Sequence, residues 1–263
     1  TGDATATGTI SARGNITFGK NAIINEVTSS NGAISVGGTT SANGNITSAK
    51  SQTFNGEFTL SKTVTILAKN NTVLFKDTVN GTYDLAIGNN ANATNVTFEK
   101  SAGSTDVINS LFVKGNITAN DKITTKGNIS IGGTSSITSA TSQSGAISLS
   151  GNATASGTIS ASGNITFVKN ANIYEVTSQN GAISVGGTTL ASGNITSAQS
   201  QTFNGAFTLQ NDITFVASKV EFKGKVDSKA GSNYSATFGN ETIKTSAAFH
   251  FSVGSSVPLG NIK

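Results

Sequence analysis

The chain has 263 residues, of which 11% are charged and 35% are hydrophobic, and its formal net charge is +4. So few charges beside so many apolar residues exclude a disordered chain, and the absence of Cys excludes disulfides and thiolate metal sites. The lysines are scattered singly and Arg13 is the only arginine, so the sequence lacks the concentrated basic face that nucleic-acid binding requires. No stretch approaches the roughly 18 consecutive apolar residues of a membrane helix. We expect a folded protein that neither binds nucleic acid nor inserts into a membrane.

The first residues, Thr1-Gly2-Asp3-Ala4, contain neither the basic region nor the apolar region of a signal peptide. The chain also lacks Met and Cys, and the absence of Cys is typical of exported bacterial proteins that fold without disulfides. We expect a mature fragment of a secreted, extracellular protein of the cell surface.

Short strands separated by tight turns are predicted along the whole chain. The turn signal is the tetrad Gly-Asn-Ile-Thr, because Gly and Asn tolerate the backbone of tight turns and Ile-Thr begins an alternating strand. In Ile165-Thr166-Phe167, for example, the two apolar residues would face inward and Thr166 outward. No segment of ten or more residues has helical periodicity, so almost no helix is expected. The tetrad, or the close relative Gly-Asn-Ile-Ser at Gly127, begins at Gly14, Gly44, Gly115, Gly127, Gly163 and Gly193.

A long internal duplication is the strongest signal in the sequence. The segment Ile10 to Leu60 recurs without a gap as Ile159 to Leu209, about 149 residues later, and a weaker match continues beyond Leu60. We therefore divide the chain into a first long repeat unit, residues 1–150, and a second, truncated unit, residues 151–263, which together form one continuous solenoid.

The repeats favour an all-β, repetitive parallel β-helix. Look-alike segments suit an architecture that adds similar turns along an axis, whereas a closed sandwich gives each strand a distinct place. Turns of about 20 to 45 residues would give roughly six to thirteen turns. Tandem β-sandwich domains are the structural alternative.

Two segments carry a resemblance to a known family. Asn180-Gly181-Ala182-Ile183-Ser184-Val185-Gly186-Gly187 and Gln201 to Leu209, with the Gly-Asn-Ile-Thr tetrads, resemble the repeat regions of filamentous-haemagglutinin-like exoproteins. The resemblance covers nearly the whole chain and implies the right-handed β-helical shaft of a two-partner-secretion or autotransporter-type adhesin. The Asn-Pro-Asn-Gly type signature of the family's secretion domain is missing, which implies shaft and not export domain.

No catalytic, cofactor-binding or metal site is predicted. His250 is the only histidine, and no Gly-x-Ser-x-Gly elbow is present. The clustered carboxylates that β-helical glycosidases and lyases use are not evident either, because the aspartates are isolated from one another in sequence. These aspartates are Asp77, Asp84, Asp106, Asp121, Asp212 and Asp227.

Asn-x-Ser/Thr sequons are frequent and have two interpretations. In the first, the asparagines occupy turns and hydrogen-bond to the backbone, some of them stacked between turns. In the second, they carry glycans. The tetrad asparagines that we consider for glycosylation are Asn15, Asn45, Asn116, Asn128, Asn164 and Asn194.

Together these observations predict an extracellular, fibrous structural and adhesive protein that is not an enzyme. Its partners would be glycans or proteins of a host or neighbouring-cell surface, bound weakly at many repeated contacts. Two alternatives are a self-assembling filament subunit that associates end to end, and a β-helical carbohydrate-active enzyme.

Overall fold

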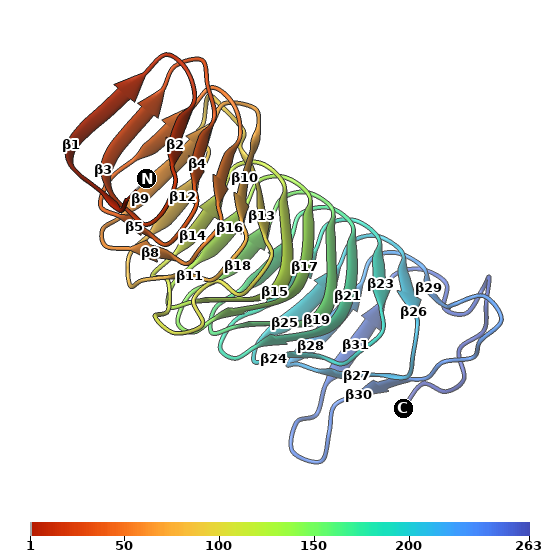
Figure 1. The fold of residues 1–263 in the computed structure, drawn as a ribbon. Coiled ribbons are helices and arrows are strands. Elements are labelled where there is room, and N and C mark those ends of the chain that lie inside the picture. The colour runs from red at the N-terminus through yellow and green to blue at the C-terminus, as the bar shows by residue number, and fades with distance from the viewer. Residues whose placement is uncertain (1) are drawn as a thin grey trace. The chain divides into compact units, whose positions relative to one another are not determined.

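The computed structural model describes residues 2–263 and shows an all-β parallel β-solenoid of about 12 turns (Figure 1). No helix occurs in these residues, so none of their elements is a helix that could cross a membrane. The predicted fold class is confirmed. The tandem-sandwich alternative is wrong, because the strands described pair in parallel with strands of the neighbouring turn.

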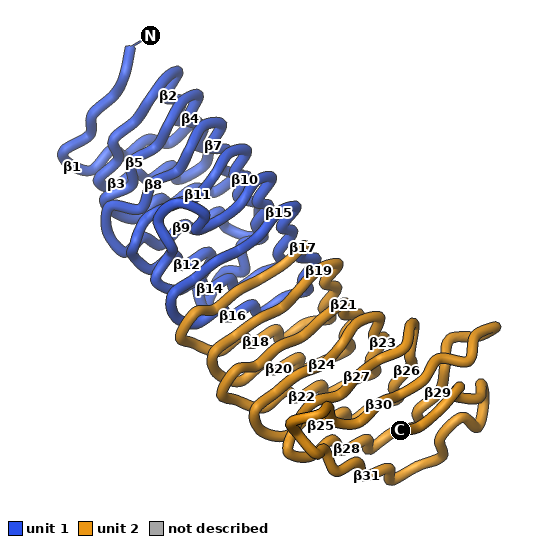
Figure 2. Tube along the Cα trace, turned by 90° about the horizontal axis from the view of Figure 1, so that it is seen from below, with its two compact units in different colours: residues 1–137 blue, residues 138–263 orange. Residues whose placement is uncertain are grey.

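The chain divides into two compact units, one ending at Ile137 and the other Thr138–Lys263 (Figure 2). The boundary falls within β17 (Ser135–Ser142). The strands of unit 1 are β1 (Ala4–Ala12), β2 (Ile16–Phe18), β3 (Ala22–Ser29), β4 (Ile34–Val36), β5 (Thr40–Ala42), β6 (Ile46–Ser48), β7 (Gln52–Phe54), β8 (Phe58–Leu60), β9 (Val64–Ala68), β10 (Thr72–Phe75), β11 (Val79–Asn80), β12 (Leu85–Ile87), β13 (Asn95–Phe98), β14 (Leu111–Val113), β15 (Ile117–Thr125) and β16 (Ile129–Ile131).

Unit 2 repeats the same kinds of strand. They are β18 (Ile147–Leu149), β19 (Ala153–Ala161), β20 (Ile165–Phe167), β21 (Ala171–Ser178), β22 (Ile183–Val185), β23 (Thr189–Ala191), β24 (Ile195–Ser197), β25 (Ser200–Phe203), β26 (Phe207–Leu209), β27 (Ile213–Val216), β28 (Lys219–Phe222), β29 (Val226–Ser228), β30 (Ala236–Phe238) and β31 (Ser246–Phe249).

Each turn contributes to three ladders, and a long strand such as β3 takes part in two of them, because it pairs with both β5 and β6. From β4 the chain passes through β5 and β6, and the next strand, β7, lies beside β4 with Ile34 opposite Gln52. The shortest turns have residues about 18 positions apart in contact, as in the hydrogen bond from Ala33 N to Asn15. The turn from Ile34 to Gln52 has the same length, slightly shorter than the 20 residues expected at minimum, because three-residue strands joined by short corners complete it.

The core consists of the alternate residues of these short strands. Ile165 and Phe167 are fully buried and Thr166 between them faces outward, as the alternation predicts. Aromatic rings stack from turn to turn in both units. Phe203 and Phe222 lie 5.2 Å apart between ring centroids at 16°, and in unit 1 Phe54 and Phe75 lie 5.2 Å apart at 15°. The duplication therefore preserves the packing of the core.

Longer turns arise where residues are added at the corners. In unit 1, Ala68 N donates to Thr94 Oγ1 across 26 positions, and in unit 2 Ala217 N donates to Thr245 Oγ1 across 28. Asn89 and Asn240 each accept backbone N–H groups within the added loops. The weaker sequence match beyond Leu60 thus corresponds to the same local structure in each unit.

The aromatic stack predicts how stability depends on single residues. Phe222 is buried between Phe203 and Phe249. Phe222→Ala is expected to lower the free energy of unfolding by about 3 to 5 kcal/mol, because packing contacts are lost and a cavity remains. Thr202→Ala, on the outward side of β25, is the control and should change the free energy of unfolding by about 0.5 kcal/mol or less. Denaturant unfolding measures both, and equal losses would contradict this account of the core.

Candidate functional site

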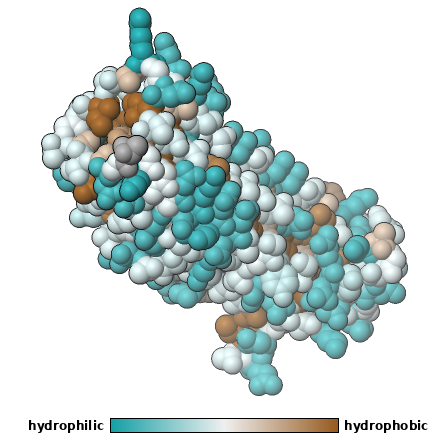
Figure 3. Space-filling model, in the orientation of Figure 1, coloured by the Kyte–Doolittle hydropathy of each residue, from teal (hydrophilic) through white to brown (hydrophobic). Residues whose placement is uncertain are grey.

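Hydroxyl side chains form continuous files on the outside of the ladders. In unit 2, Ser148, Thr166, Ser184 and Thr202 lie in register on successive strands, and Glu221 continues the file. Each lies between two buried residues of its strand. On the face seen in Figure 3, hydrophilic residues accordingly predominate over small hydrophobic areas. The outer surface of each unit is therefore polar and repetitive.

Asparagines connect the corners of successive turns. Asn164 Oδ1 accepts the backbone N–H of Ala182 at 2.9 Å, and Asn194 Oδ1 accepts that of Thr214 at 2.8 Å. The interpretation of these asparagines as turn residues that bond to the backbone is therefore confirmed. The same contact is made by Asn15, Asn45 and Asn116 from the tetrads, and by Asn21, Asn95 and Asn170 outside them.

All six asparagines considered for glycosylation are exposed at corners of the solenoid. Five of them use Oδ1 in the contact above, and the backbone oxygen of Asn128 accepts the N–H of Leu111. The sequon residue Asn80 differs, because it is only 2% exposed and its side-chain amide donates to Glu57 Oε1 at 2.9 Å. Exposure thus separates the tetrad asparagines from Asn80. The sequence analysis did not select Asn21 and Asn170, because both follow a lysine and lie outside the tetrads. The signal that could have found them is the duplication, since Lys-Asn-Ala occurs at both places, 149 positions apart.

His250 lies on the outside of unit 2 beside Glu221. Its Nε2 is 2.9 Å from Glu221 Oε1, and Lys219 and Lys223 flank the same carboxylate at 3.6 and 3.9 Å. The hydrogen bond with His250, followed by the two lysine charges, lowers the pKa of Glu221. The cluster is a surface network in which the His250 and lysine side chains are about half exposed and the Glu221 side chain is 22% exposed.

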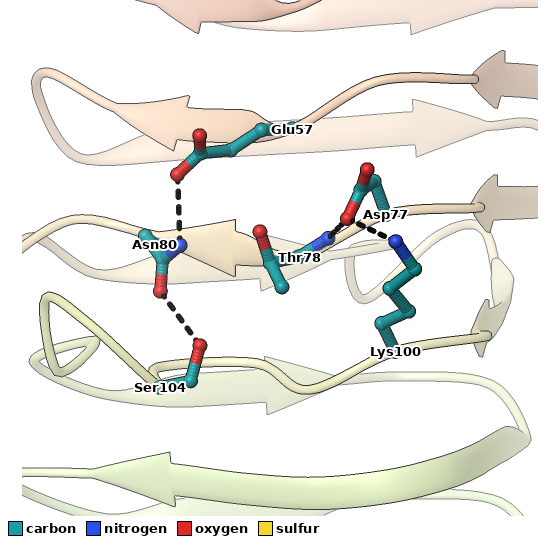
Figure 4. A network of polar contacts seen from close by, with 6 residues as sticks. All are labelled: Glu57, Asp77, Thr78, Asn80, Lys100 and Ser104. Atoms are coloured by element: carbon teal, nitrogen blue, oxygen red, sulfur yellow. Dashed lines mark hydrogen bonds and ion pairs between the residues drawn. The ribbon is translucent and has the colours of Figure 1, made fainter.

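Several aspartates form hydrogen bonds or ion pairs with residues of another turn. Asp84 Oδ1 accepts hydrogen bonds from Asn109 and Ser110, both at 2.6 Å. In Figure 4, Asp77 bonds to Lys100 at 2.9 Å, beside the Glu57, Asn80 and Ser104 network. In unit 2, Asp212 and Asp227 accept backbone N–H groups of later turns, those of Ser235 and Ser256.

The other two of these six aspartates differ from each other. Asp121 Oδ1 accepts the backbone N–H of the adjacent Lys122, whereas the backbone oxygen of Asp106 accepts the N–H of Gly81 on an earlier turn. Residues 2–263 hold no group of three or more His, Asp or Glu side chains arranged for a metal ion. Most of these aspartates therefore connect one turn to another.

Comparisons with protein families, with curated proteins and with solved structures give no match for this chain. The structure itself establishes the architecture, a parallel β-solenoid that is compatible with a β-helical repeat protein.

The asparagine contacts predict a measurable stability difference. Asn164→Ala leaves the N–H of Ala182 without its acceptor, so we expect a loss of about 1 kcal/mol in the free energy of unfolding. Asn152→Ala is the matched control, since Asn152 is exposed and its side chain makes no hydrogen bond within residues 2–263. Denaturant unfolding compares the two variants, and indistinguishable midpoints would show that the contact contributes nothing.

The pair in Figure 4 predicts a pH effect. The hydrogen bond from Lys100, with that from the Thr78 N–H, lowers the pKa of Asp77 in the folded protein. A lowered folded pKa gives stability that is present above the unfolded pKa and is lost as pH falls through the folded pKa. Lys100→Met should raise the pKa of Asp77 toward its ordinary 3.8, so the stability that this carboxylate contributes above the unfolded pKa becomes smaller. NMR titration of the carboxyl group measures the pKa of Asp77. Lys50→Met is the control and should leave this pKa unchanged.

Proposed function

We propose that this chain is a structural and adhesive segment of an extracellular fibrous protein, of the kind found in the shafts of filamentous-haemagglutinin-like bacterial adhesins. Its partners are glycans or proteins on the surface of a host or neighbouring cell. The observation that carries the proposal is the repetitive polar outer surface, in which hydroxyl and amide groups recur from turn to turn in both units.

Repetition supports adhesion without a deep pocket. A single file of Ser and Thr side chains offers weak contacts, but many weak contacts made together raise the effective concentration of each one. The shaft assignment rests on the sequence resemblance and on the solenoid fold, which agree with each other.

A second candidate is a self-assembling filament subunit, and apolar side chains on the outside of the described turns favour it. Val168 is 50% exposed and Phe112 is 36% exposed. Exposed apolar side chains of this kind can contact a second copy of the chain.

The third candidate, a carbohydrate-active enzyme, lacks a specific observation in its favour. The aspartates described above are used as hydrogen-bond acceptors between turns, which gives them a structural role.

Adhesion by many weak contacts predicts a steep dependence on surface density. Beads coated with the chain should attach to cells only above a threshold density, whereas the free chain in solution should compete poorly. Beads coated with the chain after heat denaturation are the control. Attachment that rises in proportion to density, or none at any density, would contradict the proposal, and X-ray scattering showing particles that lengthen with concentration would favour the filament instead.

A further inference from the structure

A shallow depression of about 230 Å³ lies on the outside of unit 2. Three successive turns contribute to it: β21, the corner between β23 and β24, and the corner between β26 and β27. Its lining is polar apart from one aromatic ring. The residues are Tyr174, Glu175, Ser192, Gly193, Asn194, Asn211 and Asp212.

Tyr174 is the unusual member of this group. It lies on β21 between the buried Ile173 and Val176, yet its own side chain is 48% exposed. Gly193 lies on the next turn directly against it, because a Cβ at Gly193 would collide with the carbonyl oxygen of Tyr174. Gly193 therefore contributes no side chain to the depression.

Polar side chains around the ring are held in place by the solenoid. Glu175 Oε2 accepts a hydrogen bond from Thr158 Oγ1 at 3.0 Å, and Asp212 Oδ1 accepts one from Ser235 N at 2.7 Å. Asn194 Oδ1 is bonded to Thr214 N, while its NH₂ group donates to no atom of residues 2–263. Each group is thus oriented by one hydrogen bond and keeps a further donor or acceptor for a ligand.

The duplication builds the same frame in unit 1 with a different lining. Asn25 occupies the position equivalent to Tyr174, and Gly44 lies against its carbonyl oxygen just as Gly193 lies against that of Tyr174. Asn43 and Lys62 line this depression in place of Ser192 and Asn211. The frame therefore folds with Asn at the tyrosine position, so the fold does not require Tyr174.

We propose that the depression at Tyr174 is a binding site for a neutral, hexose-containing saccharide. The exposed ring offers its negative π-face to the C–H groups of a pyranose, and the surrounding amide and carboxylate groups match hydroxyls that both donate and accept. Glu175 and Asp212 disfavour acidic sugars by charge repulsion. The inference rests on the proposed adhesive function and deepens it by naming one site and one ligand class.

The test uses the residue that the other unit already carries. Tyr174→Asn reproduces the lining of unit 1 and is expected to fold. Maltotriose, cellotriose and triacetylchitotriose serve as neutral probes, and sialyllactose as the acidic one. We expect at least one neutral probe to shift the ring signals of Tyr174, one of only three tyrosines, and its affinity to fall about tenfold or more in the variant.

A gain-of-site variant provides the matched control. Asn25→Tyr combined with Lys62→Asn transfers two features of the unit 2 site to unit 1, and should raise the stoichiometry from one saccharide per chain to two. Binding of the neutral probes to Tyr174→Asn with unchanged affinity, absence of binding to the natural chain, or binding of sialyllactose alone would overturn the proposal.

The bead assay separates the two proposals. If Tyr174→Asn beads attach to cells as well as beads of the natural chain, and trisaccharide binding is also unchanged, the saccharide site is wrong while the adhesive function stands. If the natural chain binds a trisaccharide through Tyr174 but its beads attach to no cell, the site stands and the adhesive function is wrong.

Discussion

Parallel, in-register stacking of successive turns is the constraint on which the rest of the structure depends. Each inward residue meets the equivalent residue of the turns before and after it, so like side chains are selected at stacked positions. The aromatic stacks in both units are the clearest result, with Phe75 parallel to Phe98 in one and Phe222 parallel to Phe249 in the other. Stacking also brings corner backbones together, so that a Cβ at Gly205 would collide with the backbone of Gly187.

The same constraint assigns the polar residues their roles. Corners break the ladder hydrogen bonds, and asparagine side chains such as that of Asn164 replace them by accepting the N–H of the next turn. Aspartates such as Asp212, which accepts the N–H of Ser235, do this where turns are longer. The groups that look functional in the sequence are thus largely part of the framework, and function has to be sought in what remains free on the outer surface.

The duplication separates residues that build the framework from residues that are free to vary on the outer surface. Residues shared by the two units, such as Gly44 and Gly193, build the frame, whereas residues that differ, such as Asn25 and Tyr174, change its lining. A solenoid can vary exposed corner residues at little cost to its core, because each strand directs alternate side chains inward and outward. One architecture can in this way combine a repetitive polar surface with a depression whose lining differs between the two units.

The sequence by itself determined the strands, their buried faces and the solenoid. It did so through the alternation of residues such as Ile165, Thr166 and Phe167, the turn tetrads and the duplication. These features suffice because strands depend on local periodicity and a solenoid depends on the stacking of like residues. The tertiary structure alone decided the length of the turn and which residues lie side by side across turns. Tyr174, Asn194 and Asp212 are far apart in the sequence and meet only because each turn returns the chain to the same corner. Register between turns depends on the lengths of all the corners, which no local pattern specifies.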